Sequence, residues 1–189
     1  EETGADVQVV AEGMGLDRRI GSHFLRAGIG YGGSCFPKDV AALKQLAGNS
    51  GYHFQLLNAV IEVNELQKRR LIGKLQKHLG SLRGRTIALL GLAFKPGTDD
   101  MREAASLVLG ARLIAEGAIV RGYDPVAGEA ARSVLHGVEV TDDVVDALRD
   151  ADAAVLVTEW PQFAELDLQS IANIMKTPVL IDGRNVFSA

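Results

Sequence analysis

Short apolar runs alternate with helical patterns from residue 85 to the end of the 189-residue chain. Five of these runs have the length of β-strands, and they cover residues 86–91, 119–123, 138–140, 153–157 and 179–181. Helical patterns lie between most of the runs, and such alternation is typical of parallel sheets built from strand–helix–strand units. We therefore predict an α/β protein whose second half is a Rossmann-like parallel sheet.

The first half of the chain has a helical pattern instead. Residues 6–13 and 38–47 are predicted to form short helices, and apolar side chains recur at helical spacing across 54–79. A helix of that length extends about 40 Å at 1.5 Å per residue. Because a small helical domain is too short to cover it, we expect a homodimer contact along 54–79. The pattern changes near 80–84, which predicts a helical domain at 1–80 and a sheet domain at 81–189.

Composition narrows the possible classes of protein. The chain is 47% hydrophobic and 23% charged, as is common for domains that bury a core, and its net charge of -4 argues against nucleic-acid or anionic-membrane partners. The longest apolar run, of about nine residues, is far shorter than the roughly 20 needed to span a bilayer. The chain opens without the basic-then-apolar pattern of a signal peptide, so we expect a cytoplasmic protein. Its four histidines lack metal-ligand spacing, so no metal site is expected.

The only cysteine, Cys35, ends a segment with four glycines at 28–34. Pro37 suits the first turn of a helix, which places Cys35 at a helix N-terminus, where unpaired N–H groups favour a thiolate. A lone cysteine is most often a small buried hydrophobe, but the flanking glycines let a ligand approach the backbone and favour a nucleophile. Lys38 adds a positive charge, and Asp39 either complements the helix end or orients a water molecule against a Cys35 adduct.

The segment after the first predicted strand lacks the Gly-x-Gly-x-x-Gly turn of dinucleotide-binding sheets, because only Gly91 is in place. We therefore expect that this sheet does not hold NAD in the usual way. Ligands of open parallel sheets bind beyond the carboxyl ends of the strands, and Lys95, Arg102 and Arg184 all belong near that edge. These three cations predict a phosphate-binding rim.

The chain carries five segments, at 17–21, 24–25, 29–39, 91–95 and 182–185, that together resemble UDP-glucose 6-dehydrogenases. The related GDP-mannose dehydrogenases usually carry Leu at the position of Phe36, and the N-acetylhexosamine branch carries His at that of Ser34. The resemblance implies that Cys35 is the catalytic thiol and that Asp39 assists it. It also implies a nucleotide-sugar site and an NAD pyrophosphate contact. The substrate residues would be Arg19 from the partner subunit, Phe24, Leu25, Tyr31, Gly32, Phe94, Lys95 and Arg184, and the NAD contact would be Arg102.

The activity implied by this resemblance is the oxidation of the C6 alcohol of UDP-glucose to a carboxylate, with two NAD and a cysteine-bound thiohemiacetal and thioester. In the family an NAD-binding domain would precede Glu1, so the resemblance implies a fragment, inactive alone, with a central dimerisation domain and a UDP-binding domain. Two alternatives stay open. One is a dehydrogenase for another nucleotide sugar, GDP-mannose above all, and the other is a nucleotide-sugar-binding module without catalysis.

Overall fold

The computed structural model describes residues 2–187, and its central element is a five-stranded sheet. All four strand pairs are parallel, and the strand order is β3-β2-β1-β4-β5. The strands are β1 (Thr86–Leu90), β2 (Ile119–Tyr123), β3 (Val138–Val140), β4 (Ala153–Leu156) and β5 (Leu180–Asp182). The predicted α/β class and parallel sheet are confirmed, and each strand boundary lies within one residue of its prediction.

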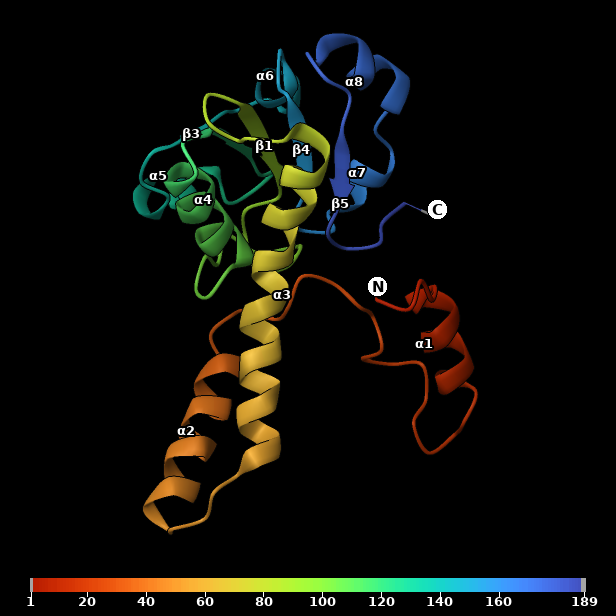
Figure 1. Ribbon diagram of the computed structural model, residues 1–189, viewed down its shortest axis with the longest axis vertical. Helices are drawn as coiled ribbons and strands as arrows, with labels where there is room; N and C mark the ends of the chain where they lie inside the picture. Colours follow the sequence, from red (N-terminus) through yellow and green to blue (C-terminus); the bar gives the residue numbers. More distant parts are fainter. Residues whose placement is uncertain (1, 188–189) are drawn as a thin grey trace.

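Helices cover both faces of this sheet (Figure 1). They are α4 (Ala105–Ala115), α5 (Gly128–Val134), α6 (Val144–Leu148), α7 (Pro161–Ala164) and α8 (Leu168–Ile174). Side chains of β1 alternate between two cores, because successive residues of a strand point to opposite faces. Ile87 and Leu89 join the core that includes α4, whereas Ala88 and Leu90 join the one beneath α6 and α7. We call residues 86–187, with the sheet and these helices, the sheet region.

Three helices precede the sheet region: α1 (Val7–Gly15), α2 (Phe36–Asn49) and α3 (Gln55–Leu79). All three were predicted, although α2 is longer at both ends than the pattern indicated. The helices α2 and α3 form an antiparallel hairpin that extends away from the sheet, and α1 lies apart from it (Figure 1). Among the described residues, no helix combines the length and the apolarity that crossing a membrane requires.

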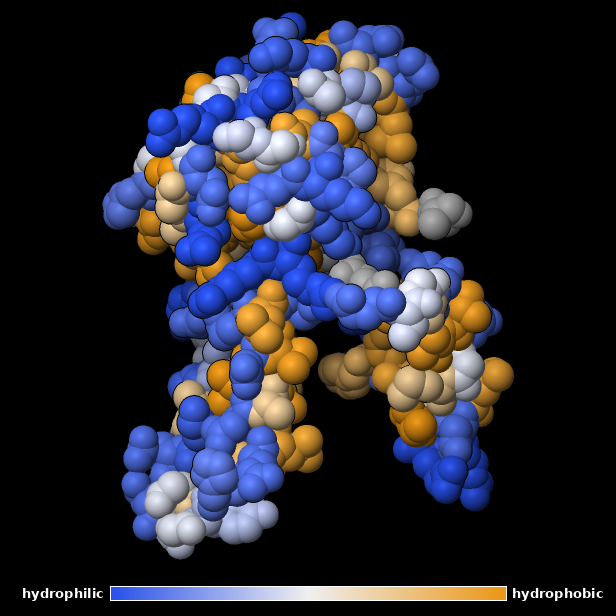
Figure 2. Space-filling view, in the orientation of Figure 1, coloured by the Kyte–Doolittle hydropathy of each residue, from blue (hydrophilic) through white to orange (hydrophobic). Residues whose placement is uncertain are grey.

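The long helix α3 has two halves with different surroundings. Leu71, Ile72 and Leu75 in its C-terminal half are buried in the core of the sheet region. In the N-terminal half, Val63 is 58% and Leu56 is 71% exposed, and Figure 2 shows apolar side chains along this part of the hairpin and on α1. The chain's own sheet region therefore covers the C-terminal half of the apolar stripe, and the homodimer contact along 54–79 stays a prediction. The boundary at 80 stays a prediction.

Candidate active site

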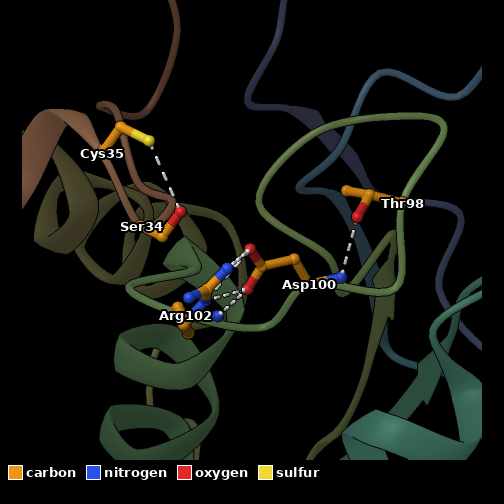
Figure 3. A network of polar contacts seen from close by, with 5 residues as sticks. All are labelled: Ser34, Cys35, Thr98, Asp100 and Arg102. Carbon is orange, nitrogen blue, oxygen red and sulfur yellow. Dashed lines mark hydrogen bonds and ion pairs between the residues drawn. The ribbon is translucent and has the colours of Figure 1, made fainter.

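Cys35 is the N-cap residue of α2, and its side chain is exposed. Its Sγ lies 3.7 Å from the Oγ of Ser34 (Figure 3). Asp39 stands in the first turn of the same helix, where its carboxylate lies 3.5 Å from the Nζ of Lys38. Both of these charged side chains are largely exposed, so the ion pair leaves Asp39 free to turn toward a ligand.

The segment that carries Cys35, residues 28–35, is called the cysteine loop, and one side of it packs on the sheet region. The N–H of Gly33 donates to the carbonyl oxygen of Arg102 at 2.9 Å. A Cβ at Gly33, where φ is +87°, would lie 2.6 Å from the ring of Phe94. A Cβ at Gly32 would lie 2.2 Å from the carbonyl oxygen of Glu103. Only glycine permits this approach, which brings the loop after β1 into contact with the cysteine loop.

The other side of the cysteine loop packs on α3 through Asn64. The Oδ1 of Asn64 accepts from the N–H of Tyr31 at 2.8 Å, and its Nδ2 donates to the carbonyl oxygen of Tyr31 at 3.2 Å. The ring of Tyr31 meets that of Phe36 edge-on, with centroids 4.8 Å apart, and burial together with nearby Glu65 raises the pKa of Tyr31. The sequence analysis missed Asn64. The available signal was a polar side chain on the apolar stripe of a long helix.

Arg102 and Asp100 form a two-point ion pair beside the cysteine loop. Arg102 donates to both carboxylate oxygens at distances of 2.7–3.1 Å, which holds the pKa of Asp100 at about 2. The guanidinium lies on the side of Asp100 that faces Ser34 and Cys35 (Figure 3). The pKa of Arg102 is raised chiefly by Asp100 and to a smaller extent by Cys35. The structure therefore brings Arg102 and the thiol into one electrostatic environment.

The remaining two cations of the predicted rim have different surroundings. Lys95 is held over the ring of Phe94, with its Nζ 5.3 Å from the ring centroid. Arg184 is largely buried, which lowers its pKa, and Glu159 lies 3.3 Å from its Nε. The Nη1 of Arg184 donates to the carbonyl oxygen of Gly30 at 3.3 Å. Arg184 thus joins the end of β5 to the cysteine loop.

A cavity of about 530 Å³ opens beside Arg184, between α1 and the segment that follows β5. Its lining includes the predicted substrate residue Leu25, together with Arg26, Glu12 and Asn185. Cavities of this size and of mixed polarity accommodate small organic ligands. The predicted residues therefore fall into two neighbouring groups, one around Cys35 and one around this cavity, and the contact between Arg184 and Gly30 connects them.

In the loop after β1, backbone amides are already hydrogen-bonded within the protein. The Oδ2 of buried Asp124 accepts from the N–H groups of Leu92 and Ala93 at 2.6 and 3.0 Å. Two backbone amides at the place where a dinucleotide-binding sheet would hold a pyrophosphate are therefore already bonded to a carboxylate. A Cβ at Gly91 would lie 2.5 Å from the side chain of Thr158, so this turn is also sterically filled.

Comparisons with known proteins decide the family. Residues 88–189 match the UDP-binding domain of the UDP-glucose/GDP-mannose dehydrogenase family, and residues 1–66 match its central domain. The chain belongs to this family. It is 50% identical over 189 residues to UDP-glucose 6-dehydrogenase YwqF of Bacillus subtilis, and 51% identical over 198 residues to a UDP-glucose 6-dehydrogenase of Pseudomonas aeruginosa. These alignments cover 100% and 98% of this chain but only 43% of each relative.

Solved structures of nucleotide-sugar dehydrogenases have the same fold. A UDP-glucose dehydrogenase from Pyrobaculum islandicum superposes with a TM-score of 0.90 at 40% identity, over 98% of this chain and 42% of that one. The UDP-D-ManNAc dehydrogenase of Pyrococcus horikoshii gives a TM-score of 0.81 at 30% identity, over 99% and 42%. The chain therefore spans less than half the length of the family members it matches.

Two residues that the family resemblance places in the substrate site do not join the others within one chain. Arg19 pairs with Asp17, and its side chain is 84% exposed. Phe24 is fully exposed and has a φ of 65°, which is uncommon for a residue with a side chain. The role of Arg19 at a partner's site stays a prediction. No group of three or more His, Cys, Asp or Glu side chains within 2–187 is arranged to hold a metal ion.

Proposed function

We propose that this chain is the cysteine-bearing, UDP-sugar-binding part of a UDP-glucose 6-dehydrogenase. One observation carries the proposal. The exposed thiol of the only cysteine stands at a helix N-terminus, where the cysteine loop contacts the sheet region at Arg102. Relatives named UDP-glucose 6-dehydrogenase align along the whole chain at 50% and 51% sequence identity, and they support this assignment. Because the chain covers less than half of each relative, the complete reaction belongs to a longer protein.

In the proposed reaction two NAD molecules accept one hydride each, and this chain supplies the nucleophile. The thiolate of Cys35 adds to the aldehyde carbon left by the first oxidation, the aldehyde oxygen takes up a proton, and a thiohemiacetal results. The second oxidation removes a hydride from that carbon and the proton from its hydroxyl, which leaves a thioester. Water then attacks the thioester, the carbon–sulfur bond breaks, and the carboxylate and the Cys35 thiolate are released. Asp39 orients this water.

The other residues bind and orient the reactants. Lys95 and Arg184 contact the nucleotide sugar, together with Leu25, Tyr31, Gly32 and Phe94. Arg102 fits a contact with the NAD pyrophosphate, because its side chain is 69% exposed although it pairs with Asp100. A homodimer through the exposed half of α3 would bring Arg19 to the partner's site. A free thiol persists most readily in a reducing compartment, which favours a cytoplasmic location.

Calorimetric titration of the chain with UDP-glucose, UDP and GDP-mannose tests this proposal. We expect UDP and UDP-glucose to bind and GDP-mannose to bind at least about tenfold more weakly, which is a difference of roughly 1.4 kcal/mol. A longer protein that joins this chain to its dinucleotide-binding domain should form two NADH per UDP-glucose. Preference for GDP-mannose would assign the other branch of the family, and binding without oxidation in the longer protein would indicate a non-catalytic module.

A further inference from the structure

Asn64 is a buried polar residue in a helix face that is otherwise mainly apolar. The buried side chains of α3 are Asn64, Lys68, Leu71, Ile72 and Leu75. A buried amide destabilises a protein unless its donor and its acceptor are both hydrogen-bonded. Here both are satisfied by one residue, Tyr31, which lies 33 positions earlier in the chain. The amide of Asn64 therefore has a specific partner, and that partner is the cysteine loop.

Two hydrogen bonds to the backbone of one residue fix its orientation as well as its position. The N–H and the carbonyl of Tyr31 are held at the same time, as a neighbouring strand would hold them. Gly30 has a φ of +101°, and a Cβ there would lie 2.7 Å from the Oδ1 of Asn64, so the loop approaches α3 as closely as glycine allows. Beyond Tyr31, the hydrogen bond from Gly33 to Arg102 anchors the loop on its opposite side.

The thiol itself has little to hold it. Cys35 is exposed, and the polar contact of its Sγ is with the neighbouring Ser34 at 3.7 Å. Its place relative to the sheet region therefore depends on the anchors of the cysteine loop, and those nearest to Cys35 are at Tyr31 and Gly33. Asn64 provides the first of these from a long, rigid helix without touching the thiol.

We propose that Asn64 is a positioning residue, which clamps Tyr31 so that the Cys35 thiol meets C6 of the bound sugar. This inference rests on the proposed function and concerns the same site. It predicts that loss of the clamp changes recognition of the glucosyl group more than recognition of the nucleotide, since Arg184 keeps its hydrogen bond to the carbonyl oxygen of Val157 even where its contact with Gly30 is disturbed.

The test compares Asn64→Ala, Asn64→Asp and the control Asn58→Ala. Asn58 lies on the same helix, and its Oδ1 has no hydrogen-bond partner among the residues that the structure describes. Asn64→Asp keeps the shape and the acceptor for the Tyr31 N–H but loses the donor to the Tyr31 carbonyl. For each protein, calorimetry measures binding of UDP and of UDP-glucose. Because the chain has one cysteine, mass spectrometry after iodoacetamide treatment reports alkylation of Cys35 alone, with and without saturating UDP-glucose.

We expect the dissociation constant for UDP-glucose to rise about tenfold in Asn64→Ala, which loses two hydrogen bonds, and at least as much in Asn64→Asp, where a carboxylate oxygen would face the carbonyl oxygen of Tyr31. Binding of UDP should change less than about twofold, a difference below roughly 0.5 kcal/mol. Saturating UDP-glucose should protect Cys35 less well in both variants, and Asn58→Ala should match the unsubstituted chain. Thermal unfolding identifies a variant that fails to fold, and Asn64→Asp, which preserves volume, then carries the test.

Equal weakening of UDP and UDP-glucose would overturn the proposal and leave Asn64 a purely structural role. Unchanged affinity and unchanged protection in both Asn64 variants would also overturn it, while the proposed function would stand. If the unsubstituted chain binds neither ligand, the proposed function fails, and the positioning role fails with it. The two failures are therefore distinguishable from one set of titrations.

Discussion

The carbonyl oxygen of Glu103 lies so close to Gly32 that a Cβ on the glycine would be 2.2 Å from it. Glu103 has a φ of 52°, a conformation that costs of the order of 1–3 kcal/mol and persists where the surrounding structure imposes it. Its neighbour Arg102 accepts the hydrogen bond from Gly33. A backbone-to-backbone contact thus joins the sheet region to the cysteine loop two to three residues before Cys35.

Gly32→Ala should separate these two segments. The added methyl group meets backbone rather than a flexible side chain, so we expect a loss of about 1–3 kcal/mol in the free energy of unfolding. UDP-glucose binding should weaken as well, because the loop that carries Cys35 must move. Gly48→Ala is the control, since no atom lies within 4 Å of a Cβ there and alanine stabilises helices by about 0.5–1 kcal/mol. Urea unfolding that gives equal stability for the two variants would contradict this contact.

The sheet was predictable from sequence because its signals are local. Apolar runs of strand length separated by helical patterns define β1 to β5, and Pro37 with the preceding glycines indicated that a helix begins next to Cys35. The position of the cationic residues Lys95, Arg102 and Arg184 at one sheet edge followed from topology alone.

Pairings between distant segments were not predictable in this way. The hydrogen bonds of Asn64 with Tyr31, and of Asp124 with the indole of Trp160, join residues 33 and 36 positions apart and leave no periodic pattern. The apolar stripe of 54–79 likewise did not show which part of the protein packs on it. Periodicity shows that a helix face is covered, but it does not show whether a partner subunit or the chain's own sheet covers it.

The ion pair between Asp100 and Arg102 should make stability depend on acid pH. Hydrogen bonds from Arg102 hold the pKa of Asp100 at about 2 in the folded protein, below the value of about 3.9 expected when unfolded. A lowered folded pKa stabilises the protein above the unfolded pKa, and this contribution is lost as the pH falls toward the folded pKa. The stability difference between the unsubstituted chain and Asp100→Asn should therefore be constant above about pH 5 and disappear near about pH 2.

Urea unfolding at several pH values measures this difference. Because the Arg102 side chain is 69% exposed, about 0.5 M NaCl should reduce the difference by screening. Asp99→Asn, which removes a neighbouring exposed carboxylate, serves as the control for the change in net charge. A difference that persists unchanged at pH 2 would contradict the ion pair.

The exposed half of α3 should form the homodimer contact. Leu56, Val60 and Val63 are 71%, 41% and 58% exposed and recur at helical spacing, so they form one apolar stripe outside the core. Val63→Glu should shift sedimentation from dimer to monomer at micromolar concentration, because pairing the stripes would bury two like charges. Val134→Glu changes an apolar residue that is 44% exposed on α5 and should leave the dimer intact. A monomeric unsubstituted chain would remove this contact and the role of Arg19 across it.

Cys35 should capture an aldehyde without any dinucleotide. The 6-aldehyde derivative of UDP-glucose should bind this chain more tightly than UDP-glucose does, because the thiol adds reversibly to its carbonyl carbon while the alcohol offers no electrophile. Borohydride reduction does not convert a thiohemiacetal into a stable adduct. Intact-mass measurement under native conditions should therefore be used to detect it. Cys35→Ala should lose both the adduct and the extra affinity while keeping its affinity for UDP.

In the longer protein, Cys35→Ser should slow both the addition to the aldehyde and the final hydrolysis. A serine hydroxyl is a far weaker nucleophile than a thiolate, and an oxygen ester releases its acyl group less readily than a thioester, so turnover should fall by about 10³-fold or more. An acyl ester on the substituted serine would be the trapped form of the second intermediate. Full activity in Cys35→Ala would overturn the mechanism, because no thioester can form without the sulfur. Poor protection of Cys35 by UDP-glucose in the unsubstituted chain would instead place the sugar away from the thiol.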